Sequence, residues 1–230
     1  MRTAIVSAMH EELAAVLALM PDESRQPVAG REFWVGHLHG REVVAVLSRI
    51  GKVAAATTAT VLAERFNVGE VVFTGVAGGL GAGVQVGDVV VADRFLQHDL
   101  DASPIFPRYE VPLYGTGEFR TDAALTTRLA AAAARALPAA RLHRGLVVSG
   151  DRFVSTTPEC RALQAALPQA LAVEMEGAAV AQVCHDYGIP FAAVRTISDR
   201  ADDAAPGDFA RFVREVASRH SAAIVEALLA

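Results

Sequence analysis

Short apolar, β-branched runs alternate with helical patterns along the whole chain, and this order constrains the fold more than any other feature. The apolar runs lack strict polar alternation, which is typical of strands covered on both faces. They occupy 3–7, 43–47, 70–73, 88–91, 145–148, 170–173 and 191–197. Helical patterns occupy 11–19, 53–66, 123–137, 158–166, 176–187 and 209–229. The sequence therefore predicts an α/β fold, with residues 1–230 as one domain because no Ser/Pro-rich linker interrupts the pattern.

Charge and cysteine content narrow the possible partners. The formal net charge is -5 and the basic residues are scattered, so we expect no nucleic-acid partner. Cys160 and Cys184 have no CxxC spacing, which disfavours a disulfide framework or a zinc site. No stretch reaches about 18 apolar residues without a charge or a breaker, so we expect no contact with a membrane. These features predict a cytoplasmic protein that holds no metal and needs no cofactor.

The segment 98–114 breaks the regular order. It carries three prolines together with aromatic and apolar residues that lack helical spacing. Such a segment is typical of an ordered functional loop or of a contact with a partner chain. Disorder is the alternative, and the apolar content disfavours it.

A glycine-rich segment, 74–80, directly follows the apolar run 71–73. Glycines at the carboxyl end of a buried strand let the backbone approach a ligand, and open α/β sheets bind small molecules at such ends. A tight turn without a ligand explains the same glycines about equally well. The segment lacks the Lys-Ser/Thr of a P-loop and the full dinucleotide fingerprint, which disfavours nucleoside triphosphates and NAD.

Acidic residues follow three further predicted strands. Glu12 lies where the first strand meets the first helix, Glu174 and Glu176 flank Met175 after the run 170–173, and Ser198-Asp199 ends the last run. Each position alone is compatible with an ordinary helix start or cap. Two acids at a buried strand end carry a desolvation cost unless they are used, and carboxylates accept hydrogen bonds from vicinal hydroxyls. A ribose is therefore a reasonable occupant.

The shared position of these segments favours one site. Four strand ends present Glu12, the glycine-rich segment, Glu174 with Glu176, and Asp199, as expected when several strands border one crevice. His10, His98 and His185 have no ligand partner at helical or hairpin spacing, so we interpret them as structural.

Together these motifs resemble the 5'-methylthioadenosine/S-adenosylhomocysteine nucleosidases of the purine nucleoside phosphorylase superfamily. The likeness covers nearly the whole chain and rests on Ala8-Met9 with Glu11-Glu12, 50–55, Thr74-Gly75 with Ala77-Gly78-Gly79, 148–151, 172–176 and 197–199. It implies a single-domain three-layer sandwich with a central mixed, twisted sheet flanked by helices. It also implies hydrolysis of the N-glycosidic bond of methylthioadenosine and adenosylhomocysteine, with 5'-deoxyadenosine as a further candidate substrate.

The resemblance also implies the catalytic residues. Asp199 is similar to the general acid that protonates N7 of adenine, with Ser198 orienting it. Glu12 resembles the base for the attacking water, and Arg195 is counted with this catalytic set. Breaking the C1'–N9 bond builds positive charge on the ribose and negative charge on adenine, so one acid must hold a proton while the other is ionised.

Substrate contacts are implied in the same way. Glu176 looks like the ligand of the ribose hydroxyls and Met175 like a residue that packs on the sugar. Glu174 is counted with the substrate-binding residues without a defined role. The contacts around the base are Ala77, Gly78, Phe153 and Val154, and those around the 5'-alkylthio group are Ile50 and Phe209. A homodimer is expected, in which the segment 98–114 contributes to the partner's pocket.

Two positions depart from the family pattern. Val76 stands where the family often has a serine near the water, and the segment 98–114 diverges from the best-known members. The valine at position 76 leaves fewer hydroxyls to position the nucleophilic water. The divergent segment 98–114 affects the shape of the pocket around the thio group and hence the preference among substrates.

Three other functions share parts of this pattern. A nucleoside phosphorylase of the same fold needs arginines and glycines for phosphate, whereas acids follow the first strand here and the glycine-rich segment has no arginine. A futalosine or aminofutalosine hydrolase acts on another 5'-extended ribose and differs only in family motifs. A non-catalytic nucleoside-binding protein would keep the pocket without the acids, but Glu12 and Asp199 are both present.

Overall fold

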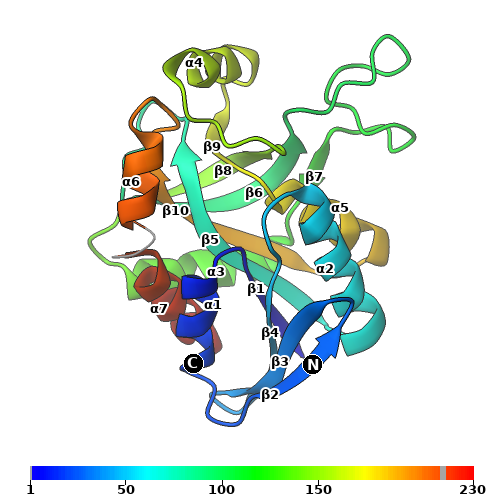
Figure 1. The fold of residues 1–230 in the computed structure, drawn as a ribbon, viewed down its shortest axis with the longest axis vertical. Helices are drawn as coiled ribbons and strands as arrows, with labels where there is room; N and C mark the ends of the chain where they lie inside the picture. Colours follow the sequence, from blue (N-terminus) through cyan, green and yellow to red (C-terminus); the bar gives the residue numbers. More distant parts are fainter. Residues whose placement is uncertain (1, 213–215) are drawn as a thin grey trace.

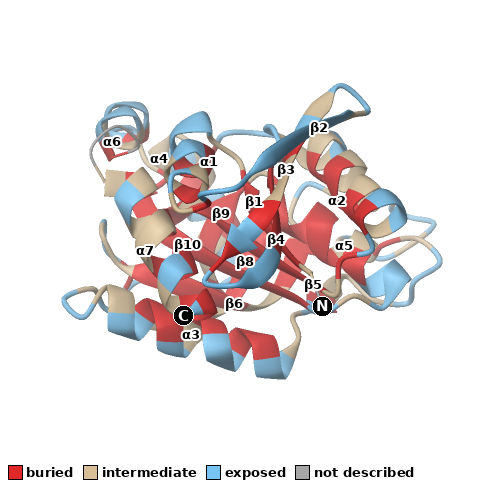
Figure 2. Ribbon diagram, turned by 90° about the horizontal axis from the view of Figure 1, so that it is seen from below, coloured by how far each residue is buried: buried red, intermediate tan, exposed pale blue. Residues whose placement is uncertain are grey.

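A mixed sheet of ten strands runs through the computed structural model, which describes residues 2–212 and 216–230. The strands are β1 (Thr3–Ser7), β2 (Ser24–Val28), β3 (Arg31–Leu38), β4 (Arg41–Leu47), β5 (Glu70–Gly79), β6 (Val89–Gln97), β7 (Glu118–Arg120), β8 (Leu142–Ser149), β9 (Ala170–Glu174) and β10 (Phe191–Asp199). Central strands consist largely of buried valine, isoleucine and alanine, which suits a sheet covered on both faces (Figure 2). The predicted α/β class is confirmed.

Strand order places the longest strand, β5, at a branch point. The order is β10-β6-β8-β9-β5-β1-β4-β3-β2, and β5 also pairs with β10. β5 runs parallel to β1 and β10 and antiparallel to β9. Five strands, β5, β10, β6, β8 and β9, therefore close on themselves (Figure 1). This closure gathers the carboxyl ends of β5, β9 and β10 at one place.

Helices cover both faces of the sheet. They are α1 (His10–Leu17), α2 (Lys52–Phe66), α3 (Ala123–Ala136), α4 (Thr157–Ala166), α5 (Gly177–Tyr187), α6 (Ala205–Phe212) and α7 (Ser218–Leu229). α2 packs beside α5 on one face, and α1, α3 and α7 pack together on the other (Figure 1). This arrangement is the expected three-layer sandwich.

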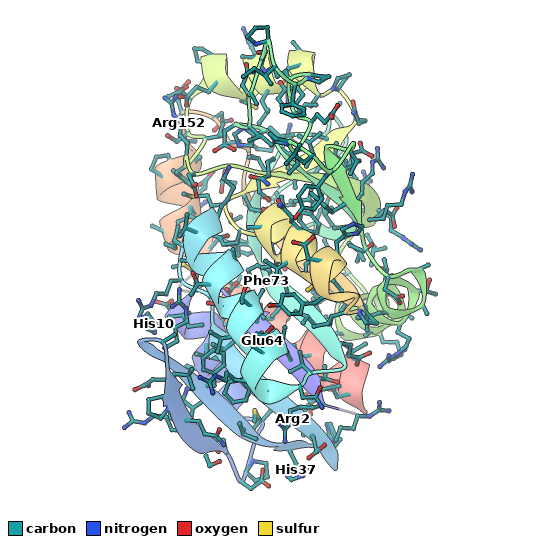
Figure 3. All side chains as sticks on the ribbon, turned by 90° about the vertical axis from the view of Figure 1, so that its right-hand side faces the viewer. Arg2, His10, His37, Glu64, Phe73 and Arg152 are labelled. Atoms are coloured by element: carbon teal, nitrogen blue, oxygen red, sulfur yellow. The ribbon has the colours of Figure 1, made fainter. Side chains whose placement is uncertain are left out.

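Each face has its own apolar core. On the α2–α5 face, Phe33 stacks on Phe66 with ring centroids 4.5 Å apart, and Phe73 lies beneath α2 (Figure 3). On the opposite face, Leu129 of α3 and Ile224 of α7 belong to a second buried cluster. Because both faces of the central strands are fully packed, the backbone that carries the strand ends is held firmly.

Some boundaries differ from the sequence prediction. Residues 74–79 continue β5 instead of forming a turn, because they pair with β10 on one side and β9 on the other. The hairpin β2–β3 was not predicted, since β2 is mostly exposed and polar and contains a proline. The helix predicted at 209–229 is described as α6 and α7, and residues 213–215 within it lie outside the described residues.

The segment 98–114 projects from the sheet between β6 and β7 (Figure 1). It forms turns, its Val111 makes an isolated bridge with Thr116 just beyond it, and it exposes Ile105 and Leu113 almost completely. Within the residues that the structure describes, no helix is both long and apolar enough to cross a membrane.

Candidate active site

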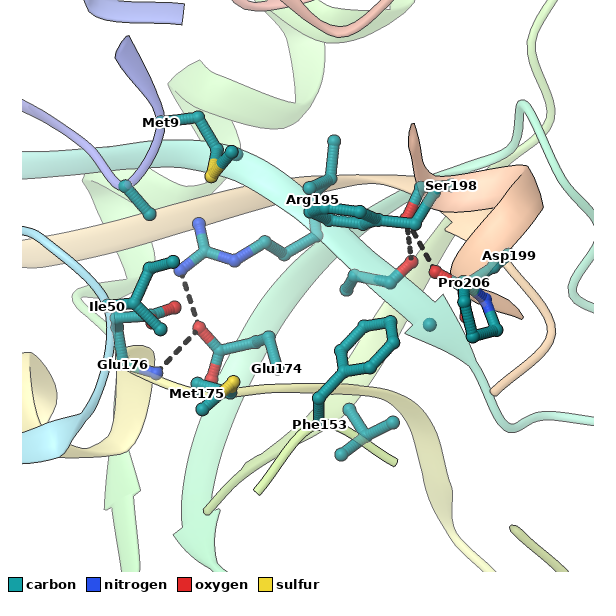
Figure 4. Close-up of a pocket in the computed structure, with 17 residues that line it drawn as sticks. Met9, Ile50, Phe153, Glu174, Met175, Glu176, Arg195, Ser198, Asp199 and Pro206 are labelled. Atoms are coloured by element: carbon teal, nitrogen blue, oxygen red, sulfur yellow. Dashed lines mark hydrogen bonds and ion pairs between the residues drawn. The ribbon is translucent and has the colours of Figure 1, made fainter. Parts of the chain in front are cut away.

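A cavity of about 480 Å³ opens where β5, β9 and β10 end and the chain leaves β1 (Figure 4). It brings together eleven of the thirteen predicted site residues: Ile50, Ala77, Gly78, Phe153, Glu174, Met175, Glu176, Arg195, Ser198, Asp199 and Phe209. Val154 lines a small adjoining hollow together with Phe153 and Asp199. Glu12 is not in the lining but lies next to Gly75, which is.

Glu12 is completely buried at the first turn of α1. The Met9 N–H donates to its Oε2 at 3.3 Å, while Oε1 has no hydrogen-bond partner among the described residues. A Cβ placed on Gly75, which lines the cavity, would lie 3.7 Å from either carboxylate oxygen. Burial raises the pKa of Glu12 to about 7, although the charge of Arg195 and the Met9 hydrogen bond act in the opposite direction. A carboxyl with this pKa is suited to exchange protons near neutral pH.

Glu174 is fully engaged by the protein. Its carboxylate accepts hydrogen bonds from the Ser149 hydroxyl and from the N–H of Gly177 at 2.9 Å, at the start of α5. The Glu176 N–H lies 3.3 Å away, and Arg195 Nη2 forms an ion pair with it at 2.8 Å. Because all these donors belong to the protein, Glu174 has little accepting capacity left for a ligand.

Glu176 has fewer partners and faces the cavity. Its Oε1 accepts a hydrogen bond from the Gly51 N–H at 2.9 Å. Burial, followed by the charge of Glu174, raises the pKa of Glu176 to about 8. An accepting oxygen that is buried and not already used by the protein is well placed to bind ligand hydroxyls.

Arg195 is the single cation in the cavity lining within residues 2–212 and 216–230. It is 1% exposed, its guanidinium lies 4.0 Å from the Phe73 ring centroid, and it donates to the Phe73 carbonyl at 3.2 Å. Its charge lowers the pKa of both Glu12 and Glu176, while it pairs directly with Glu174. Three acids therefore surround one guanidinium, which leaves this end of the cavity favourable for positive charge.

Asp199 is 1% exposed at the end of β10. The register of β10 against β5 shifts between Ile197 and Asp199, and such a bulge re-aims the side chains around it. Asp199 Oδ1 accepts from the Ala201 N–H at 2.8 Å. Oδ2 accepts from the Ser198 hydroxyl at 2.8 Å (Figure 4). Burial raises the pKa of Asp199 despite these hydrogen bonds.

Gly78 makes the position of Asp199 possible. A Cβ on Gly78 would lie 2.9 Å from Asp199 Oδ1 and 3.1 Å from Ala201 Cβ, closer than real side chains pack. Gly78 therefore leaves room for Asp199 because it has no Cβ, and it lies in a strand and not in a turn.

The residues of the site fall into two groups. We call Glu12, Glu174, Glu176, Arg195 and Asp199 the floor, because none of them is more than 7% exposed. We call Ile50, Phe153, Pro206 and Phe209 the rim, since they line the opening from loops and helix ends. Phe153 and Phe209 meet edge to face at 5.5 Å, while Ile50 is 58% exposed.

Several lining residues were not named as contacts from the sequence: Ala8, Met9, Gly75, Val173 and Pro206. Val76, which the family resemblance placed near the water, also lines the cavity. Pro206 lies three residues before Phe209, so both occupy one face of α6, and this spacing was the available signal. His10, His98 and His185 are not in the described lining of this cavity. Among residues 2–212 and 216–230, no group of three or more His, Cys, Asp or Glu is placed to hold a metal ion.

Comparisons with known proteins agree in sequence and in structure. A family model described as the phosphorylase superfamily matches residues 2–230. The chain is 37% identical over 229 residues to the 5'-methylthioadenosine/S-adenosylhomocysteine nucleosidase of Shewanella denitrificans, covering 100% of this chain and 99% of that protein.

Solved structures match over nearly the full length. The corresponding nucleosidase of Neisseria meningitidis, in complex with methylthio-immucillin-A, has a TM-score of 0.92 and 36% identity, covering 99% of this chain and 98% of that one. A futalosine hydrolase of Helicobacter pylori has a TM-score of 0.91 and 34% identity, covering 99% and 97%.

Proposed function

The chain belongs to the phosphorylase superfamily and, within it, to the 5'-methylthioadenosine/S-adenosylhomocysteine nucleosidases, and on this premise we propose how its residues divide the work. The protein hydrolyses the N-glycosidic bond of these nucleosides, releasing adenine and a 5-thio-substituted ribose. The observation that carries the mechanism is the floor, where Glu12, Glu174 and Glu176 surround Arg195, with Asp199 across the cavity.

Charge at the floor favours the transition state. As the C1'–N9 bond breaks, the ribose becomes positive and the departing base becomes negative. A sugar seated beside Glu12 and Glu176 places its developing positive charge near acids that outnumber the cation. An interaction that strengthens as charge develops lowers the barrier more than one made equally in the ground state.

Asp199 acts as the general acid. Burial raises its pKa, which favours the protonated form that can donate to N7 of adenine. The Ser198 hydroxyl lies 2.8 Å from Oδ2 and 3.3 Å from the Ala77 carbonyl oxygen, so it can hold the carboxyl in one orientation. Ala77, Gly78, Phe153 and Val154 supply the surfaces around the base.

Glu12 acts as the general base. Its unpartnered Oε1 is available to accept a proton from water held between Glu12 and the anomeric carbon. The new C1'–O bond forms as the C1'–N9 bond breaks, the water proton passes to Glu12, and the proton of Asp199 leaves with adenine. Val76 presents no hydroxyl to this water, so Glu12 carries more of its positioning.

Glu176 binds the ribose hydroxyls and Met175 packs against the sugar. Glu174 had no defined role from the sequence, and its carboxylate is occupied by Ser149, Arg195 and the start of α5. It fixes Arg195 and the backbone of Glu176, and Arg195 in turn limits how far the pKa values of Glu12 and Glu176 rise. Arg195 is therefore an electrostatic positioning residue.

The rim holds the 5'-alkylthio group against Ile50 and Phe209. Ile105 and Leu113, on the projecting segment 98–114, are 82% and 91% exposed, and Val53 near the rim is 77% exposed. Apolar side chains this exposed are typical of a protein interface. We expect a homodimer in which the segment borders the partner's pocket, and light scattering tests it because Ile105→Asp should then yield monomers.

Two further properties belong to the same proposal. Cys160 and Cys184 are free and buried, which suits a reducing cytoplasm. The chain is proposed to act as one domain, since residues from Glu12 to Phe209 border a single cavity.

A futalosine hydrolase is the second candidate, favoured by the Helicobacter pylori structure. A phosphorylase is disfavoured because Arg195, the one cation in the described lining, already pairs with Glu174. The test is base release from methylthioadenosine, adenosylhomocysteine, inosine and futalosine, with and without phosphate. We expect adenine release that is independent of phosphate, and a phosphate requirement would disprove hydrolysis.

A further inference from the structure

The start of α2 is tied to two other segments by a small ionic network. Lys52 Nζ donates to Asp99 Oδ1 at 2.6 Å and to Gln97 Oε1 at 3.0 Å. Asp99 Oδ2 accepts from the Asp151 N–H at 2.8 Å, and Asp151 Oδ1 accepts from the Lys52 N–H at 2.7 Å. The network therefore joins the first turn of α2 to the residues that follow β6 and β8.

This network is more than a surface ion pair. The side chains of Lys52 and Asp99 are 16% and 31% exposed, so both are largely shielded from water. Burial raises the pKa of Asp99, but hydrogen bonds from Lys52 and from the Asp151 N–H outweigh it and leave the pKa below its usual value. Partly buried pairs with several hydrogen bonds hold geometry better than exposed pairs.

The residue held in place is Gly51, immediately before Lys52. Its N–H donates to Glu176 Oε1 at 2.9 Å, and its φ of 97° lies in a region that other residues rarely adopt. The first N–H groups of a helix have no partner within the helix, so their direction depends on what holds the helix start. Here the N–H of Gly51 meets Glu176 and the N–H of Lys52 meets Asp151.

We propose that Lys52, Asp99 and Asp151 are positioning residues that aim Glu176 at the ribose hydroxyls by fixing the Gly51 N–H. This inference rests on the proposed function, in which Glu176 binds those hydroxyls. The network touches neither the reacting bond nor the described lining of the cavity. It acts on the sugar only through one backbone donor.

A purely structural ion pair would behave differently. Its loss would lower stability and reduce activity on every substrate by the same factor. Loss of a positioning network weakens only the contact that Glu176 makes with the sugar. A substrate that lacks this contact should therefore be insensitive to the network, and this difference separates the two roles.

The experiment compares 5'-methylthioadenosine with its 2',3'-dideoxy analogue, which lacks both hydroxyls that Glu176 is proposed to bind. Lys52→Met removes the ammonium and keeps the aliphatic stem, and Asp99→Asn removes the opposite charge. Lys52→Arg is the conservative variant that can restore the pairing. Arg144→Met is the matched control, because Arg144 pairs with Asp93 on exposed parts of β8 and β6, away from the cavity. Thermal unfolding of each variant is recorded with kcat and KM.

For the wild-type protein, we expect loss of both hydroxyls to reduce kcat/KM by about 10- to 100-fold or more, as for hydrogen bonds to a charged group. Lys52→Met should lose about tenfold in kcat/KM on methylthioadenosine, mainly through KM, and less than about twofold on the 2',3'-dideoxy analogue. Asp99→Asn should show the same pattern, and Lys52→Arg should recover most of the loss. Arg144→Met should match the wild type on both substrates.

Equal losses on the two substrates, or full activity of Lys52→Met on both, would overturn the proposal. Failure of both variants to fold, while Arg144→Met folds, would also overturn it by making the network purely structural. A wild-type protein that releases no adenine from either compound would instead refute the proposed function.

Discussion

The floor and the rim of the cavity are built in different ways. Floor residues lie within or shortly after strands packed on both faces, and none is more than 7% exposed. Rim residues come from the start of α2, the loop after β8 and the short helix α6, and Phe153 remains 41% exposed. In the proposed mechanism, the groups that act on the N-glycosidic bond lie on the rigid part, and the groups that contact the 5' substituent lie on the adaptable part.

This difference explains how one fold serves related substrates. A nucleosidase and a futalosine hydrolase match the chain with TM-scores of 0.92 and 0.91. A conserved backbone can keep the N-glycosidic chemistry while the surroundings of the 5' group change. Substitutions on the floor should therefore alter kcat on every substrate, whereas substitutions on the rim should alter the ratio between substrates.

The largest effect is expected at Asp199. Asp199→Asn keeps the shape and the contact with the Ala201 N–H but removes the acidic proton. We expect kcat on methylthioadenosine to fall about a thousandfold, as for loss of a general acid. Adenine release gives the rate, and calorimetric titration with adenine checks that the pocket still forms. Retention of more than about a tenth of the wild-type rate would remove Asp199 from the proton-donor role.

The second-largest effect is expected for Glu12→Gln, which should lower kcat about a hundredfold. Because the pKa of Glu12 is about 7, wild-type kcat/KM should decline as the pH falls below 7 and the base becomes protonated. The variant has no such group and should lose this acidic limb. The test is to measure kcat/KM of both proteins from pH 5 to 9. If kcat/KM of Glu12→Gln declines at low pH as it does in the wild type, the titrating group is not Glu12.

The same substitution should stabilise the protein. The pKa of Glu12 rises from 4.5 to about 7 on folding, so between these values the folded state holds a proton that the unfolded state has lost. The wild type therefore loses stability as the pH rises through this window, by at most about 3 kcal/mol. Glu12→Gln avoids this loss.

Urea unfolding of both proteins at pH 5 and pH 8 measures the difference. The variant should gain over the wild type at pH 8 and much less at pH 5. Glu176 titrates in both proteins, so its contribution largely cancels. Equal free energies of unfolding at pH 8 would show that Glu12 is not penalised by burial.

The smallest effect is expected at the rim. Phe209→Ala removes the partner of Phe153 and widens the opening without touching an acid. We expect kcat to change less than about threefold, while KM rises about fivefold for methylthioadenosine and less for adenosylhomocysteine, whose tail extends further out. Kinetics on the two substrates provide the check. A large, equal fall in kcat on both would place Phe209 functionally with the floor.

Much of the floor could be predicted because its signals are local. Strands buried on both faces are continuous apolar runs, so the ends of β1, β9 and β10 were predicted within a few residues. Acids at such ends stand out because burial of a carboxylate needs a reason. The roles of Asp199 and Glu12 came from the family resemblance, not from these patterns.

The remaining features depend on contacts that are distant in sequence. Glu174 is satisfied by Ser149 and Arg195, 25 and 21 residues away, and no spacing rule indicates such partners. Glycines in β5 resemble a turn locally, and only pairing with two neighbouring strands makes them extended. The exposed strand β2 has too few apolar residues to produce a pattern.

The imbalance of three acids around Arg195 has one more consequence. Glu12 and Glu176 have pKa values of about 7 and 8, so near neutrality this end of the cavity stores protons that it can release. A neutral ligand bound at equilibrium meets a partly protonated wall, and a bound cationic ligand shifts the acids toward their ionised forms. The charge of the pocket can thus adjust to the charge of a bound ligand through protonation of Glu12 and Glu176, without movement of the backbone.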